Sequence, residues 1–269
     1  MKVFKHLDKL RSQLKSTNNF DRWKNKINAN VVISGIYHVI YSFAYTYFVM
    51  HFKDSREDIA TVYWLNMETE YSEVLYALNF MMLFLKRALT FGYCTYFVHF
   101  YLVTCFVIIK TCKMYRNEMG KEDACDMNIL YGLLTRTTSK IDRRLNFLAF
   151  ISFTLLFFHS TSHVFLLIFG DDFFFEFASL FHFIECFNSL SGFLVMIYAG
   201  AMVNDSGRAL QEKAMSLDAE LYLEQPEILL KYQRFKIAMT LWDVINLQKS
   251  LIVTIVEVVV SYVVLVGTT

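Results

Sequence analysis

The chain has 269 residues, of which 55% are apolar and 17% aromatic, with a formal net charge of +1 and a single proline, Pro226. This composition excludes a disordered, collagen-like or disulfide-stapled chain, and the near-zero net charge gives no reason to expect a nucleic-acid partner. Because the apolar residues stand in long blocks, the sequence predicts a helical membrane protein.

Five blocks are long and apolar enough to be membrane spans, since a bilayer core of about 30 Å needs about 20 mostly apolar residues in a helix. In chain order these predicted spans cover residues 31–52, a stretch within 74–109, residues 145–169, about 173–203, and 251–266. The blocks lack the alternating pattern of a membrane barrel and are too long for buried strands. The predicted fold class is therefore all-α, a polytopic membrane protein with about five transmembrane helices.

The lysines and arginines between the spans predict the orientation. Residues 1–30 hold eight of them, residues 110–144 eight and residues 204–250 six, whereas residues 53–73 hold only two against six acids. Positive charge favours the cytoplasmic side. The sequence thus predicts an inverted topology in the plasma membrane, with a cytoplasmic N-terminus and an extracellular C-terminus.

The predicted cytoplasmic segments are expected to be largely helical. Residues 110–144 contain no proline and predict a helical extension below the membrane. Pro226 suits the first turn of a new helix, and the broad apolar stripe of residues 227–248 predicts an amphipathic helix leading into the last span. We divide the chain into a basic tail (1–30), a four-helix region with the extension (31–203), and anchor helices with the last span (204–269).

No motif in the chain indicates catalysis. The sequence has no zinc-ligand spacing, no phosphate-binding loop and no nucleophile elbow. We therefore predict no catalytic residues, no enzyme activity and no cofactor.

The C-terminal block carries a resemblance to a known family. Ser261 and Tyr262 are followed by five small or apolar residues and then by Thr268 and Thr269. With the inverted topology and the long cytoplasmic helices, this block resembles the insect chemoreceptor superfamily, which comprises gustatory receptors and, more distantly, odorant receptors. The family has Thr-Tyr, five apolar residues and Gln-Phe here, so the tyrosine matches and the two threonines depart from the pattern.

The resemblance implies a function. Family members have seven spans, so this chain looks like a gustatory-receptor-like member that lacks the first two. The implied function is a chemosensory subunit of a ligand-gated, non-selective cation channel, a homo- or hetero-tetramer with related subunits around a pore formed by the last helix. The alternative, motivated by the five spans and the absent Gln-Phe pair, is a divergent or truncated receptor-like protein without channel activity, serving as an accessory or scaffold subunit.

Mapping through the tyrosine motif implies which residues line the pore. Thr268 stands where the family has its pore-facing glutamine, and the same helix face carries Leu265, Ser261 and Glu257. A ring of four Glu257 carboxylates would favour cations. The alternative is that Glu257 pairs with a basic side chain such as Lys249, and both remain open at this stage.

The resemblance places the ligand, a tastant-like small molecule, among the earlier spans in the outer half of the membrane. Polar and aromatic residues predicted at that depth are Tyr41, Tyr45, His159, His163, His182 and Glu185. The pairs His159/His163 and His182/Glu185 each share a helix face and can bind a polar ligand or titrate. Two histidines and a glutamate also suit a metal, and buried histidines are often packing residues, so these alternatives stay open; the prediction names no metal.

Overall fold

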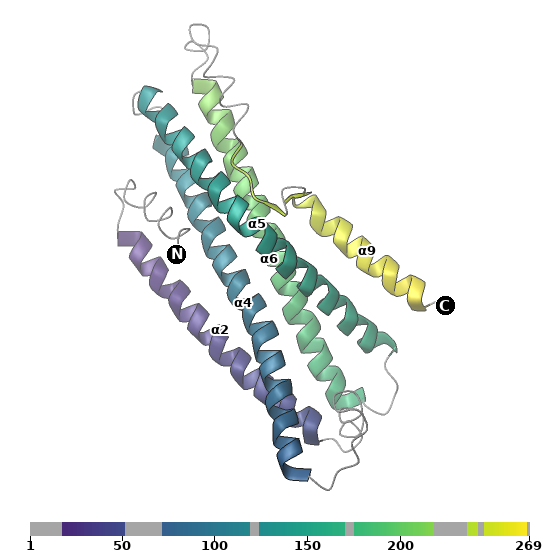
Figure 1. The fold of residues 1–269 in the computed structure, drawn as a ribbon. Coiled ribbons are helices and arrows are strands. Elements are labelled where there is room, and N and C mark those ends of the chain that lie inside the picture. Colours follow the sequence, from purple (N-terminus) through teal and green to yellow (C-terminus); the bar gives the residue numbers. More distant parts are fainter. Residues whose placement is uncertain are drawn as a thin grey trace. The chain divides into compact units, whose positions relative to one another are not determined.

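The structure is a computed structural model and describes residues 18–51, 72–118, 124–169, 175–217, 236–241 and 245–267. These residues form five helices and one two-stranded hairpin (Figure 1). The elements are α2 (Asn18–His51), α4 (Ser72–Glu118), α5 (Ala124–Phe169), α6 (Phe175–Leu217), β1 (Thr240–Leu241), β2 (Ile245–Asn246) and α9 (Ser250–Gly267). The all-α fold class is confirmed, and each predicted span lies in one of these helices over its described residues; residues 52, 173 and 174 lie outside them.

The described helices contain no proline, and several of their buried hydroxyls are satisfied within the helix. The hydroxyl groups of Thr104, Thr111 and Thr135 donate hydrogen bonds of 2.8–2.9 Å to the backbone carbonyls four residues earlier. All three threonines are buried. A polar side chain that bonds to its own helix needs no partner from a neighbouring helix, which suits an apolar surrounding.

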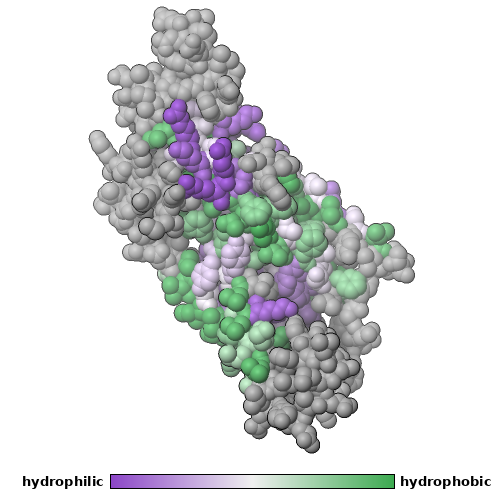
Figure 2. All heavy atoms as spheres, viewed as in Figure 1, coloured by the Kyte–Doolittle hydropathy of each residue, from purple (hydrophilic) through white to green (hydrophobic). Residues whose placement is uncertain are grey.

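Three of the helices are long and apolar enough to cross a membrane, judged by length and composition over the described residues. The qualifying segments are Phe80–Asn117 in α4, Tyr131–Phe165 in α5 and His182–Ser216 in α6. Helices α2 and α9 form where the first and last spans are predicted but are not among these three. Large apolar side chains lie on the outside, with Phe158 and Phe187 each 63% exposed, and Figure 2 shows such residues on the visible face. The chain is a multi-pass membrane protein, and its orientation stays a prediction.

The described helices belong to two compact units, each of which we describe by itself. One comprises residues 20–97, with α2 and the first part of α4, and the other contains residues 98–269. In the second unit α5 packs along α6, and α9 contacts both. Its fully buried side chains include Tyr101, Ile108, Leu134, Ile141, Phe193, Ile197 and Leu210. Helix α6 runs through residue 203 without a break, and the predicted three-part division of the chain remains a prediction.

The predicted helix at residues 227–248 is wrong over its described part. Residues 240–241 and 245–246 pair as antiparallel strands, with Thr240 opposite Asn246 and Leu241 opposite Ile245. Apolar residues in this segment are buried, including Ile237, Met239 and Leu247. The same set of apolar positions fits a helical stripe, so periodicity alone could not separate the two structures. The parts of the prediction at 227–235 and 242–244 lie outside the described residues.

Two polar side chains from distant helices hold this hairpin in place. The amide oxygen of Asn204 on α6 accepts the N–H of Met239 at 2.7 Å, and its amide nitrogen donates to the carbonyl of Leu247 at 2.7 Å. The carboxylate of Asp142 on α5 accepts both the N–H (2.9 Å) and the hydroxyl (2.8 Å) of Thr240. These side chains satisfy backbone groups that a helix would have satisfied internally.

Two glycines on α6 allow the hairpin segment to approach closely. A Cβ atom built on Gly207 would overlap the carbonyl oxygen of Ile237 and lie 2.8 Å from that residue's Cβ. A Cβ atom on Gly200 would overlap the side chain of Leu247. Because Gly200, Asn204 and Gly207 follow one another at helical spacing, one face of α6 is shaped to receive the segment that leads into α9.

Candidate functional site

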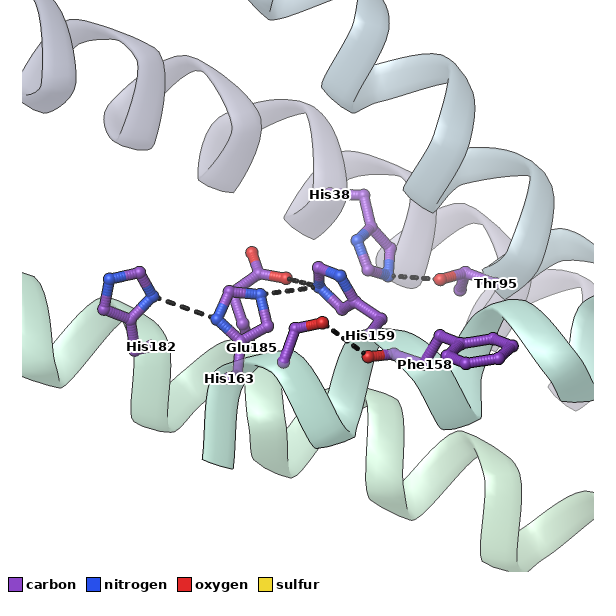
Figure 3. A network of polar contacts seen from close by, with 8 residues as sticks. His38, Thr95, Phe158, His159, His163, His182 and Glu185 are labelled. Atoms are coloured by element: carbon purple, nitrogen blue, oxygen red, sulfur yellow. Dashed lines mark hydrogen bonds and ion pairs between the residues drawn. The ribbon is translucent and has the colours of Figure 1, made fainter. Parts of the chain in front are cut away.

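Four titratable side chains meet between α5 and α6 (Figure 3). The Nε2 atom of His159 lies 3.0 Å from Oε2 of Glu185 and 2.9 Å from Nε2 of His163. The Nδ1 atom of His163 lies 2.9 Å from Nδ1 of His182. We call these four residues the His–Glu cluster, and it contains all of the predicted ligand-binding residues on α5 and α6.

The arrangement follows from helical spacing combined with the packing of α5 on α6. His159 and His163 are one turn apart on α5, and their rings meet edge to face with centroids 4.2 Å apart. His182 and Glu185 are nearly one turn apart on α6. Each α5 histidine therefore contacts one residue of α6, and the structure links the two predicted pairs into one network.

Because Glu185 is buried, it is the member of the cluster that most strongly favours a positive charge beside it. Its side chain is 1% exposed and that of His159 is 29% exposed, while His163 is buried. Glu185 lies in a candidate span, where an unpaired carboxylate costs about 2.5–3.5 kcal/mol or more. One turn further along α6, the buried hydroxyl of Ser189 has no hydrogen-bond partner among the described residues. The cluster is thus a buried polar site that favours a positive charge next to Glu185.

The two predicted ligand-binding tyrosines lie in the other unit. The guanidinium carbon of Arg87 stands 3.3 Å from the ring centroid of Tyr45 and 5.7 Å from that of Tyr41. In the same unit, His38 and Thr95 share a 2.8 Å hydrogen bond, drawn in Figure 3, that sequence reasoning missed. A single pocket combining the tyrosines with the His–Glu cluster stays a prediction.

The predicted pore residues lie on α9, as far as the structure describes them. Glu257, Ser261 and Leu265 are all exposed on this helix, Leu265 by 65%. Tyr262 belongs to the helix by its backbone, whereas Thr268 lies outside the described residues. Their role in a pore remains untested.

Lys249, which the sequence offered as a partner for Glu257, has another partner. Its ammonium lies 2.8 Å from a carboxylate oxygen of Asp205 on α6, and both side chains are about half exposed. The hydrogen bond to Asp205 and the attraction of its charge raise the pKa of Lys249 above the ordinary value of 10.5. The pair ties the start of α9 to α6.

The polar residues of α9 form a stripe that sequence reasoning found only in part. Ser250, Thr254, Glu257 and Ser261 follow at intervals of four, three and four residues and are all exposed. At about 100° per residue, they stay within roughly 60° of one another around the helix. Ser250 and Thr254 were missed, although the spacing of three or four residues was the signal that could have found them.

The side of α9 that packs on its own chain lies opposite this stripe. Among the side chains of α9 that the structure describes, the half-buried ones are Leu251, Ile252 and Ile255, whose mean direction lies about 130° around the helix from the centre of the stripe. The hydroxyl of Thr254 donates a long bond of 3.4 Å to the carbonyl of Ser250. Within one chain, the polar stripe therefore points away from α5 and α6.

Comparisons with known proteins add a likeness of fold. No protein-family model and no curated protein matches the chain. Among solved structures, the chain is similar to the insect olfactory receptor OR5 from Machilis hrabei, with a TM-score of 0.48 and 12% sequence identity over 97% of this chain and 74% of that one. That receptor is a member of the insect chemoreceptor superfamily. What this chain binds or conducts has to be argued from its own residues.

Proposed function

We propose that the chain is a gustatory-receptor-like, chemosensory subunit of a ligand-gated, non-selective cation channel in the plasma membrane. In this proposal, four subunits, identical or related, surround an axis lined by α9. The polar ligand, a tastant-like small molecule, binds at the His–Glu cluster and the neighbouring helices. The N-terminus is cytoplasmic, and the C-terminus is extracellular.

The observation that carries the proposal is the exposed polar stripe on α9. Glu257 and its polar neighbours stand on an otherwise apolar helix whose opposite side packs on the chain's own bundle. In a bilayer, a carboxylate at such a place needs water or a partner. Several copies of α9 around one axis would enclose a water-filled path lined by the stripe. The exposed valines beside the stripe would then contact lipid and the neighbouring subunits.

The chemistry of the stripe favours cations. Four Glu257 side chains facing one path would form a ring of negative charge, which raises the local concentration of cations and repels anions. The hydroxyl oxygens of Thr254 and Ser261 can coordinate a passing cation, and Leu265 adds an apolar constriction. The C-terminal resemblance around Tyr262 supports the same assignment of α9 to the pore.

The test is current recording from purified full-length protein reconstituted in planar bilayers, with candidate ligands added. Glu257→Gln keeps the size of the side chain and removes its charge, so we expect a cation-to-anion permeability ratio reduced by several-fold. Val256→Gln is the matched control, because Val256 is exposed and lies about 130° around the helix from the centre of the stripe, so its substitution should leave the ratio unchanged.

Two outcomes would overturn the proposal. The first is an unchanged permeability ratio for Glu257→Gln in a channel that conducts. The second is the absence of any ligand-evoked current from tetrameric, correctly inserted protein, alone or with related subunits, which would favour an accessory or scaffold subunit.

A further inference from the structure

The His–Glu cluster presents three metal-ligand atoms at one point. One ring nitrogen from each of His159 and His163 and a carboxylate oxygen of Glu185 all lie within 4.8 Å of one another. Around a tetrahedral zinc ion, with bonds of about 2.0–2.1 Å, ligand atoms are about 3.3 Å apart. Two of the three separations, 2.9 Å between the two histidine nitrogens and 3.0 Å between His159 and Glu185, need to widen by only a few tenths of an ångström. The third, between His163 and Glu185, is bounded at 4.8 Å and closes to the same value when the side chains rotate toward a common ion.

Without a cation, these three atoms cannot all form well-aligned hydrogen bonds with one another. A neutral imidazole nitrogen carries either one hydrogen or one lone pair, and an ionised carboxylate only accepts. The Nε2–H of His159 must then serve both Glu185 and His163, so at least one of these bonds is bent. A metal ion at the centre accepts lone pairs from all three atoms at once and removes this competition.

The fourth member of the cluster orients one ligand. Nδ1 of His163 lies 2.9 Å from Nδ1 of His182. When the N–H of His163 donates to His182, the lone pair of His163 is on Nε2, the atom that faces His159 and Glu185. An outer residue that fixes the tautomer of a metal-binding histidine in this way is a regular feature of metal sites.

The donor set and its burial favour a first-row transition ion over Ca²⁺ or Mg²⁺, which need six or more oxygen ligands or several waters. Two imidazoles with one carboxylate suit Zn²⁺. The 1% exposure of Glu185 adds a requirement for positive charge that a divalent ion meets. Three protein ligands leave the fourth tetrahedral position open for water or for a group on a ligand.

From these contacts we propose that His159, His163 and Glu185 bind one Zn²⁺ ion between α5 and α6, with His182 as a positioning residue. The site coincides with the one that the proposed function assigns to the ligand, so zinc would act there as a ligand or as part of its binding site. Metal binding itself requires no channel activity and can be tested without it.

The test measures zinc in the purified, detergent-solubilised full chain after chelator treatment, addition of ZnCl₂ and desalting. We expect about one zinc per chain, and expect Glu185→Gln and His159→Gln to reduce the zinc affinity by more than 100-fold. His182→Gln should weaken binding by about 10- to 100-fold, as expected for an orienting residue. Co²⁺ in place of zinc should give the intense visible absorption of a tetrahedral site.

His38→Gln is the matched control, because His38 is a hydrogen-bonded histidine outside the cluster and its loss should leave zinc binding unchanged. Each variant must elute as a single folded species. Equal zinc affinity in wild type and both ligand variants would overturn the proposal, as would a folded wild-type chain that binds no zinc. Zinc binding without ligand-evoked current would instead refute the channel while leaving the metal site intact.

Discussion

The contact between Asn204 and the hairpin gives the sharpest test of how α9 is positioned. Replacing Asn204 with alanine removes two hydrogen bonds of 2.7 Å to the backbone of Met239 and Leu247 and a longer one of 3.4 Å to the Met239 carbonyl. Both backbone partners belong to fully buried residues. The substitution therefore leaves an amide N–H and a carbonyl without their partner.

The expected cost follows from these bonds. An intramolecular hydrogen bond contributes about 0.5–1.5 kcal/mol, and a buried group left unsatisfied costs about 1–3 kcal/mol. Asn204 is half-buried, so water can replace part of the lost bonding. We expect the free energy of local opening of residues 236–250 to fall by about 2–3 kcal/mol, which corresponds to a roughly 30- to 150-fold faster amide exchange.

Hydrogen–deuterium exchange read by mass spectrometry, on protein in nanodiscs, measures this change in peptides that cover residues 236–250. Peptides from the middle of α5 and α6 should exchange as in the wild type. Asp205→Asn is the neighbouring control, since it alters an exposed ion pair and should change exchange little. Unchanged exchange of the hairpin peptides in Asn204→Ala would refute the view that this side chain holds the segment.

Two further predictions concern the same region. Gly207→Ala should destabilise the hairpin by about 1–3 kcal/mol, because the new methyl group overlaps the carbonyl of Ile237. Gly192→Ala should be neutral or stabilising, since its Cβ would meet only ordinary contacts at 3.7 Å or more. Equal melting temperatures for the two variants would contradict this prediction. Since Asp205 raises the pKa of Lys249, their pairing is present below the ordinary lysine pKa and is lost as pH rises through the raised value. Acylation of Lys249 near pH 10 should accordingly be faster in Asp205→Asn, and an equal rate would count against the pair.

The extent of the helices was predictable from the sequence because long apolar blocks without proline have few alternatives in a bilayer. Where the structure describes them, the predicted spans fall within α2, α4, α5, α6 and α9, and the predicted extension at 110–144 is helical. Glu257 and Ser261, which the resemblance around Tyr262 together with helical spacing singled out, are both exposed on α9. Each of these features depends on residues that are close together in the sequence, so a sequence pattern can reveal it.

The hairpin could not be predicted in this way. Its backbone is satisfied by Asp142, 98 positions before its partner Thr240, and by Asn204, 35 positions before Met239. In the sequence, Asp142 and Asn204 look like ordinary polar residues on a helix, so neither could be recognised as a contact of the hairpin. A segment that depends on such distant partners carries no local signal of its structure.

The sequence predicted the His–Glu cluster only in part, and the tertiary structure decided the rest. Helical spacing placed His159 beside His163 and His182 near Glu185, and the sequence alone supported those pairs. Only the packing of α5 on α6 decided that His159 meets Glu185 and that His163 meets His182. The reason is that a sequence gives the faces of each helix, whereas the rotation and depth at which two faces meet depend on the side chains of both helices together.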